Sequence, residues 1–170
     1  MIDERTRINE YTGQVTTSTT RFPEALDDEG YLFMIRNRQC RIFSEVQFPK
    51  ALSYSDKGRI QNLSKCIEKD TNCLVKRTKC GKTHMTEHDI YKSLDLGERQ
   101  GITLLRKLTK LGLIAKVSIE SKGIKTHKYY INPMYYIAGK RLSPALYRMF
   151  AEWLDPILPV WASIQLKQIK

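Results

Sequence analysis

Two helical patterns lie close together in the middle of the chain. Thr86 stands three residues before Asp89, a variant capping box that predicts the start of a short helix. A second helix is predicted over 98–111, because leucines recur there three or four positions apart, and Gly112 can end it. Residues 95–97 separate the two helices. The pattern therefore predicts a helix-turn-helix unit.

Strand patterns follow the second helix. Residues 113–120 and 124–131 are rich in β-branched and aromatic side chains, and the turn sequence Ser-Lys-Gly lies between them. They predict an antiparallel hairpin with a basic tip. A short helix, a turn, a longer helix and a hairpin, in this order, are typical of a winged helix-turn-helix, whose second helix enters the major groove of DNA. The expected fold class is therefore α+β, mainly α.

The residues before this unit predict shorter elements. Apolar side chains at helical spacing over 55–72 predict a helix of about 15 residues. Residues 31–35 and 41–43 predict an N-terminal β-hairpin. The basic stretch 76–82 contains a glycine, so we expect it to turn between two short extended pieces. Residues 1–20 are too polar to build a core by themselves, and we expect a loose arm there.

The last part of the chain predicts two helices. Ser143 followed by proline is a strong helix start, and Asp155 followed by proline ends that helix. A shorter helix is expected within 159–170. The expected organisation is an acidic, partly disordered arm over 1–28, a winged helix-turn-helix domain with an N-terminal hairpin over 29–133, and a C-terminal helical extension over 134–170.

The charge of the chain favours an anionic partner. The 170 residues include 29 Lys and Arg against 18 Asp and Glu, which gives a net charge of +11. Residues 1–30 hold three basic and seven acidic side chains, so the positive excess lies in the rest of the chain. Such an excess attracts nucleic acid or an acidic membrane face. No run approaches the roughly 18 apolar residues of a membrane span, and the first ten residues match neither a signal nor a transit peptide. We therefore expect a cytoplasmic protein without a membrane partner.

The predicted second helix carries a polar stripe opposite its apolar side. The residues of the stripe are spaced four, three and four apart and share one face of the helix. They are Arg99, Thr103, Arg106 and Lys110, with Gln100 and Lys107 on the flank. On an isolated helix this stripe would more often be a solvated face. The adjoining hairpin and the positive charge favour recognition of duplex DNA instead.

The stripe divides into two expected roles. Arg reaches O6 and N7 of guanine, and Gln reaches N6 and N7 of adenine. The expected base readers are Arg99, Gln100, Thr103 and Arg106. Lys107 and Lys110 lie later, where the helix axis leaves the groove, and are expected to contact phosphates. On the hairpin, the same role is expected for Lys122, Lys125 and Lys128.

Two other chemistries are less favoured by the sequence. Cys73, Cys80, His84 and His88 lack the close cysteine pair of a zinc finger, so free thiols are the preferred interpretation. The pairs Tyr129-Tyr130 and Tyr135-Tyr136 could attack phosphate, but the three histidines form no His-x-His pair to support that chemistry. Packing of the hairpin against the C-terminal helices is the expected role of these rings. The sequence therefore predicts no catalytic residue, no metal and no cofactor.

The C-terminal segment carries a stripe of large apolar residues. These are Leu146, Phe150, Trp153, Leu154 and Trp161. They could form the lid of a single core or the seam of a dimer. The seam is favoured, because a dimeric winged helix recognises two symmetric half-sites. A homodimer is therefore expected.

Four segments carry a family resemblance. They are 29–34 (EGYLFM), 94–100 (LDLGERQ), 129–133 (YYINP) and 139–141 (GKR). Together they resemble the winged-helix replication proteins of Gram-positive plasmids and phages, the RepL type, over about residues 29–155. The resemblance implies binding to duplex DNA at an origin, recruitment of host replication proteins and no catalytic centre. The alternative is a winged-helix transcriptional regulator that binds a promoter operator.

Overall fold

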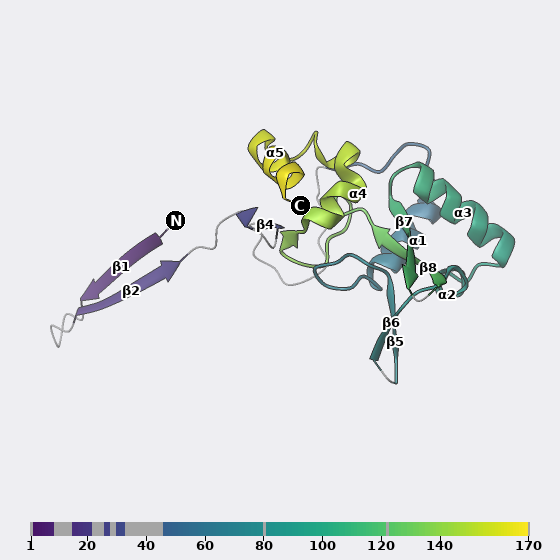
Figure 1. The fold of residues 1–170 in the computed structure, drawn as a ribbon, viewed down its shortest axis with the longest axis horizontal. Helices are drawn as coiled ribbons and strands as arrows, with labels where there is room; N and C mark the ends of the chain where they lie inside the picture. Colours follow the sequence, from purple (N-terminus) through teal and green to yellow (C-terminus); the bar gives the residue numbers. More distant parts are fainter. Residues whose placement is uncertain are drawn as a thin grey trace.

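The computed structural model of the protein describes residues 2–8, 15–21, 26–27, 30–32, 46–79, 81–121 and 123–169. Within these ranges the chain forms five helices and four small antiparallel sheets, a mixed α/β fold (Figure 1). None of the helices in the described ranges is long and apolar enough to cross a bilayer.

The N-terminal residues form strands. β1 (Ile2–Ile8) pairs antiparallel with β2 (Val15–Arg21), with Ile2 opposite Arg21. Within the arm expected over 1–20, the described residues therefore pair with each other. The threonine-rich β2 has a high propensity for strand.

A three-stranded sheet joins an N-terminal segment to the segment before α4. Its strands are β3 (Leu26–Asp27), β4 (Gly30–Leu32) and β9 (Arg141–Leu142), in the order β3-β4-β9. Tyr31 is paired with Leu26 on one side and Leu142 on the other. The hairpin expected over 31–35 and 41–43 lies mostly outside the described residues.

The first helix is shorter than its apolar spacing predicts. α1 (Tyr54–Ser64) begins at the N-cap Ser53, whose Oγ accepts a hydrogen bond of 3.1 Å from the backbone N–H of Asp56. The chain then turns, and Asp70 and Asn72 both have positive φ. Left-handed backbone cannot continue a right-handed helix. The apolar residues beyond Ser64 therefore lie in a turn, although their spacing in the sequence resembles that of a helix.

The central elements follow the predicted order. β5 (Val75–Thr78) and β6 (Gly81–His84) form a hairpin that projects from the fold in Figure 1, and α2 (Glu87–Ser93) and α3 (Glu98–Lys110) come next. The capping box at Thr86 is confirmed: its Oγ1 accepts from Asp89 N at 3.2 Å, and Asp89 Oδ2 accepts from Thr86 N at 2.9 Å.

The predicted second hairpin is also confirmed. β7 (Ile114–Ser121) and β8 (Ile124–Ile131) pair antiparallel in one register from Ile114↔Ile131 to Ser121↔Ile124. Cys73 bridges Tyr130, and the N–H of Leu74 donates to the carbonyl of Tyr129 at 2.7 Å. The segment after α1 therefore lies beside β8 through an isolated β-bridge.

The C-terminal helices pack on the rest of the chain through one side. α4 (Pro144–Leu154) and α5 (Val160–Gln168) pack over a cluster that includes Ala115 and Tyr130 of the second hairpin. Leu146, Phe150 and Leu154 are each no more than 1% exposed. These three residues therefore close the core of a single chain, which is one of the two expected roles, and leave no surface of theirs for a partner; the homodimer itself stays a prediction. Trp161 is 47% exposed.

Two glycines allow close packing around α3. At Gly101 a Cβ atom would lie 2.2 Å from the ring of Tyr91, which leaves space only for hydrogen. At Gly112, where φ is +70°, a Cβ atom would overlap the indole of Trp153. The first contact sets the spacing of α2 and α3, and the second places α4 against the end of α3.

Replacement of Gly101 by alanine should destabilise the protein by about 1–3 kcal/mol, because the overlap with Tyr91 forces the two helices apart. This cost exceeds the gain of about 1 kcal/mol in helix propensity. Gly58 of α1 is the matched control, since a Cβ atom there meets nothing within 4 Å. Urea unfolding should show Gly58→Ala as neutral or stabilising, and equal effects of the two variants would contradict the packing argument.

Candidate nucleic-acid interface

The predicted polar stripe of α3 is fully formed and faces solvent. Its apolar side is buried through Gly101, Leu104, Leu105 and Leu108. The stripe residues Arg99, Thr103, Arg106 and Lys110 are all exposed, as is Gln100 on the flank. The hydroxyl of Thr103 donates to the carbonyl of Arg99 at 2.9 Å. In both figures α3 lies on the side of the fold away from α5, so its polar face is not covered by the C-terminal helices.

Lys107 differs from the other basic residues of α3. Its Nζ lies 2.8 Å from Oδ2 of Asp56, a carboxylate of α1 that also accepts from Arg59 at 3.2 Å. Burial raises the pKa of Asp56, but the hydrogen bonds from Lys107 and Ser53 and the charge of Lys107 together outweigh burial and hold the pKa below its usual value. Lys107 thus joins α3 to α1 within the protein.

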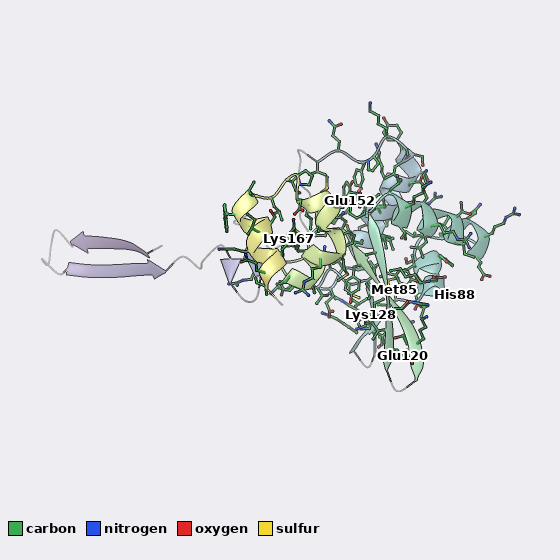
Figure 2. All side chains as sticks on the ribbon, turned by 45° about the horizontal axis from the view of Figure 1, so that its top comes forward. Met85, His88, Glu120, Lys128, Glu152 and Lys167 are labelled. Atoms are coloured by element: carbon green, nitrogen blue, oxygen red, sulfur yellow. The ribbon has the colours of Figure 1, made fainter. Side chains whose placement is uncertain are left out.

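The register of the β7–β8 hairpin separates its lysines onto two faces. Lys125 is opposite Glu120, whereas Lys128 is opposite Val117 and points to the other face. Figure 2 shows Glu120 near the far end of the hairpin and Lys128 nearer its base. Lys128 is half-buried, and Lys125 is exposed. Lys122 lies outside the described residues. The expected set of hairpin lysines therefore does not form one surface.

Lys116, which the sequence did not single out, shares the face of Lys125. Its cross-strand partner is Tyr129, and both side chains reach Glu87 in the first turn of α2. Lys116 Nζ lies 2.7 Å from Glu87 Oε1, and the hydroxyl of Tyr129 donates to the same oxygen at 2.5 Å. The hydroxyl of Tyr91 donates to Oε2 at 3.2 Å. Alternation along β7 could have indicated Lys116, but its contact with a residue 29 positions away could not be read from the pattern.

These bonds stabilise the charged form of Glu87. The hydrogen bonds from Lys116 and Tyr129 lower the pKa of Glu87 from 4.5 to about 2. Because α2, β7 and β8 all contribute to this cluster, it fixes the hairpin at one angle to the helix pair. The angle in turn sets the gap between α3 and β7.

A cavity of about 510 Å³ occupies that gap. It is lined by Glu87 and Tyr91 of α2, by Ile102, Leu105, Arg106, Thr109 and Lys110 of α3, and by Lys116 of β7. Three of the lining residues are cations and one is an anion. The groove therefore combines a mostly apolar floor with positive charge along both walls, and it adjoins the exposed stripe of α3.

The other candidate residues are placed by packing. Tyr129, Tyr135 and Tyr136 are at most 4% exposed, and Tyr135 stacks on Phe48 with ring centroids 5.0 Å apart. Cys73 Sγ lies 3.3 Å from Nδ1 of His84, and burial raises the pKa of the Cys73 thiol. Cys80 lies outside the described residues. Among the residues with described coordinates, no group of three His, Cys, Asp or Glu side chains could hold a metal ion.

No protein-family model matches the chain, and no curated protein or solved structure is significantly similar to it. The interpretation of the groove and of the α3 stripe therefore depends on the geometry and charge described above.

Glu87→Gln tests the cluster that fixes the hairpin. Because the folded-state pKa of Glu87 lies below the unfolded value, its charge stabilises the fold above about pH 4.5, and this contribution disappears as the pH falls toward 2. At pH 7 the variant should be less stable by about 1 kcal/mol or less, since the side chains of Glu87 and Lys116 are 40% and 39% exposed. Urea unfolding at several pH values should show that the difference in unfolding free energy between the two proteins shrinks below pH 4.5. A difference that does not change with pH would refute this role.

Proposed function

We propose that the protein binds duplex DNA through a winged helix-turn-helix formed by residues 54–131. The order α1, α2, α3, β7 and β8 supports this assignment, because it is the order in which such a module presents its second helix and its hairpin on one side. The β5–β6 hairpin is inserted between α1 and α2. The observation that carries the proposal is the exposed stripe of Arg99, Thr103, Arg106 and Lys110 on a helix whose opposite side is buried.

In this proposal α3 enters the major groove. Arg99 and Gln100 in its first turn, with Thr103 and Arg106 one turn later, face the base edges. An α-helix with its side chains is about 10–12 Å across, which suits a major groove about 12 Å wide. The exposed guanidinium groups provide the two-point donors that guanine requires.

The groove between α3 and β7 suits one phosphate strand of the same duplex. Lys110 lines its α3 wall, and Lys125 extends the positive face along the hairpin. Lys116, on the other wall, is already paired with Glu87 and positions the hairpin. Phosphate contacts position a protein on DNA without reading sequence. We assign Lys107 a different role, as an anchor of α3, because its charge is already neutralised by Asp56.

The biological role that we propose is initiation of plasmid or phage replication by origin binding, with host replication proteins recruited to the complex. It is supported by the RepL-type resemblance of segments such as Tyr-Tyr-Ile-Asn-Pro at 129–133.

Single substitutions should separate base readers from phosphate contacts. Arg99→Ala or Arg106→Ala should cost about 1–3 kcal/mol on the specific site and relax the base preference. Lys110→Ala and Lys125→Ala should weaken binding to every duplex alike and reduce the salt slope by about 1 each. Lys107→Ala is the control on the same helix and should affect stability more than affinity. Fluorescence anisotropy on specific and random duplexes measures all five, and uniform losses across them would rule out the division of roles.

A nuclease footprint across the protein's own gene and flanking DNA, at low and near-physiological salt, tests the function itself. Protection of repeated sites away from a promoter supports origin binding. A single palindromic footprint over a promoter would indicate a regulator instead. Protection that disappears at physiological salt would contradict sequence-specific recognition.

A further inference from the structure

The β5–β6 hairpin, residues 75–84, has a composition that core formation does not explain. It contains Lys76, Arg77, Lys79 and Lys82 and no acidic residue. Apart from Val75, every described side chain in the two strands is exposed. A two-stranded ribbon open to water on both faces gains little stability from packing. Its projection from the fold in Figure 1 therefore needs another reason.

Charge repulsion is built into this hairpin. Arg77 pairs directly with Lys82 across the two strands, so the two cations lie on the same face. Like charges at directly opposite positions destabilise an antiparallel pair. Lys82 has only a distant acidic neighbour, Glu68 at 3.9 Å. In the described part of the chain, no carboxylate forms an ion pair with Arg77 or Lys79. A polyanion would offset this repulsion.

The opposite face of the hairpin is fixed to the helix-turn-helix. Lys76 Nζ lies 2.7 and 2.8 Å from the two carboxylate oxygens of Asp89 in the first turn of α2. Glu87, two residues earlier in the same turn, holds Lys116 of β7. One turn of α2 therefore anchors both hairpins. Figure 2 shows Met85 and His88, which stand just before and within this turn, close to the two hairpins.

The base of the β5–β6 hairpin lies beside β8. Cys73, just before β5, forms a β-bridge with Tyr130 of β8, and its Sγ lies 3.3 Å from Nδ1 of His84, the last residue of β6. Burial and the charge of Lys128 of β8 lower the pKa of His84, and the charge of Glu68 raises it. The bases of the two hairpins are therefore adjacent.

From these contacts we infer that the β5–β6 hairpin is a second phosphate-binding element, in which Arg77, Lys79 and Lys82 contact the DNA backbone beyond the segment bound by α3 and the β7–β8 hairpin. The inference rests on the proposed function. It predicts a longer contact along the duplex than one helix and one hairpin provide, without any added base readout.

The test is a double variant, Arg77→Ser with Lys82→Ser, in the full chain. The matched control is Lys50→Ser with Lys140→Ser, which removes the same charge from exposed positions outside α3 and both hairpins. The probe is a random-sequence duplex of about 40 base pairs, and its Kd is measured between 50 and 200 mM salt. Removal of two phosphate contacts should make the slope of log Kd against log salt concentration smaller by about 1.8. The factor by which Kd rises between 50 and 200 mM salt should then be about tenfold smaller than for the natural protein. The control should keep the slope of the natural protein.

Thermal unfolding separates a binding role from a structural one. Removal of the Arg77–Lys82 repulsion should leave the Tm unchanged or raise it, whereas a hairpin that serves the fold would lose stability. The inference would be overturned if the Arg77→Ser, Lys82→Ser variant kept the original salt slope. If the Arg99→Ala, Arg106→Ala variant lost binding in the same assay, DNA binding through α3 would still stand. Equal effects of the double variant and its control would also overturn the inference. A natural protein that fails to bind the duplex at 50 mM salt would overturn both proposals.

Discussion

The position of α3 relative to the β7–β8 hairpin depends on one buried amide. Asn132, at the end of β8, is completely buried; its Nδ2 donates to the carbonyl of Gly112 at 2.7 Å, and its Oδ1 accepts from the N–H of Met134 at 2.9 Å. Gly112 follows α3 and Asn132 follows β8. The side chain of Asn132 therefore connects the end of the helix to the end of the hairpin. A buried amide without these partners would cost about 1–3 kcal/mol, which favours a single geometry at this junction.

The acidic first turn of α2 also fixes the positions of both hairpins. Glu87 holds the β7–β8 hairpin through Lys116 and Tyr129, and Asp89 holds the β5–β6 hairpin through Lys76. Hydrogen bonds from Lys76 and Thr86 lower the pKa of Asp89 to about 2, so it stays charged under all ordinary conditions. In a strongly basic chain these two carboxylates hold the two hairpins in place.

The C-terminal helices complete the same body. α4 and α5 cover the face of the β7–β8 hairpin that is turned away from α3, through contacts with Ala115 and Tyr130. Asp155 joins them, because it accepts from Tyr147 of α4 at 2.5 Å and lies 2.8 Å from Nζ of Lys167 in α5. Large apolar residues at helical spacing are compatible with a dimer seam and with an internal core alike. Burial alone distinguishes the two.

The sequence by itself determined the elements whose signals are local. The capping box at Thr86, the glycine after α3 and the alternation over 114–131 gave the helix pair and the hairpin nearly to the residue, and helical spacing identified the exposed stripe of α3. The tertiary structure decided which charges are available. Lys107 and Lys110 look alike in the sequence, but only Lys107 meets Asp56, 51 residues away. The same holds for Lys116, whose partner is Glu87 of α2. An ion pair between distant segments has no periodic signature, because it depends on where the whole chain places both partners.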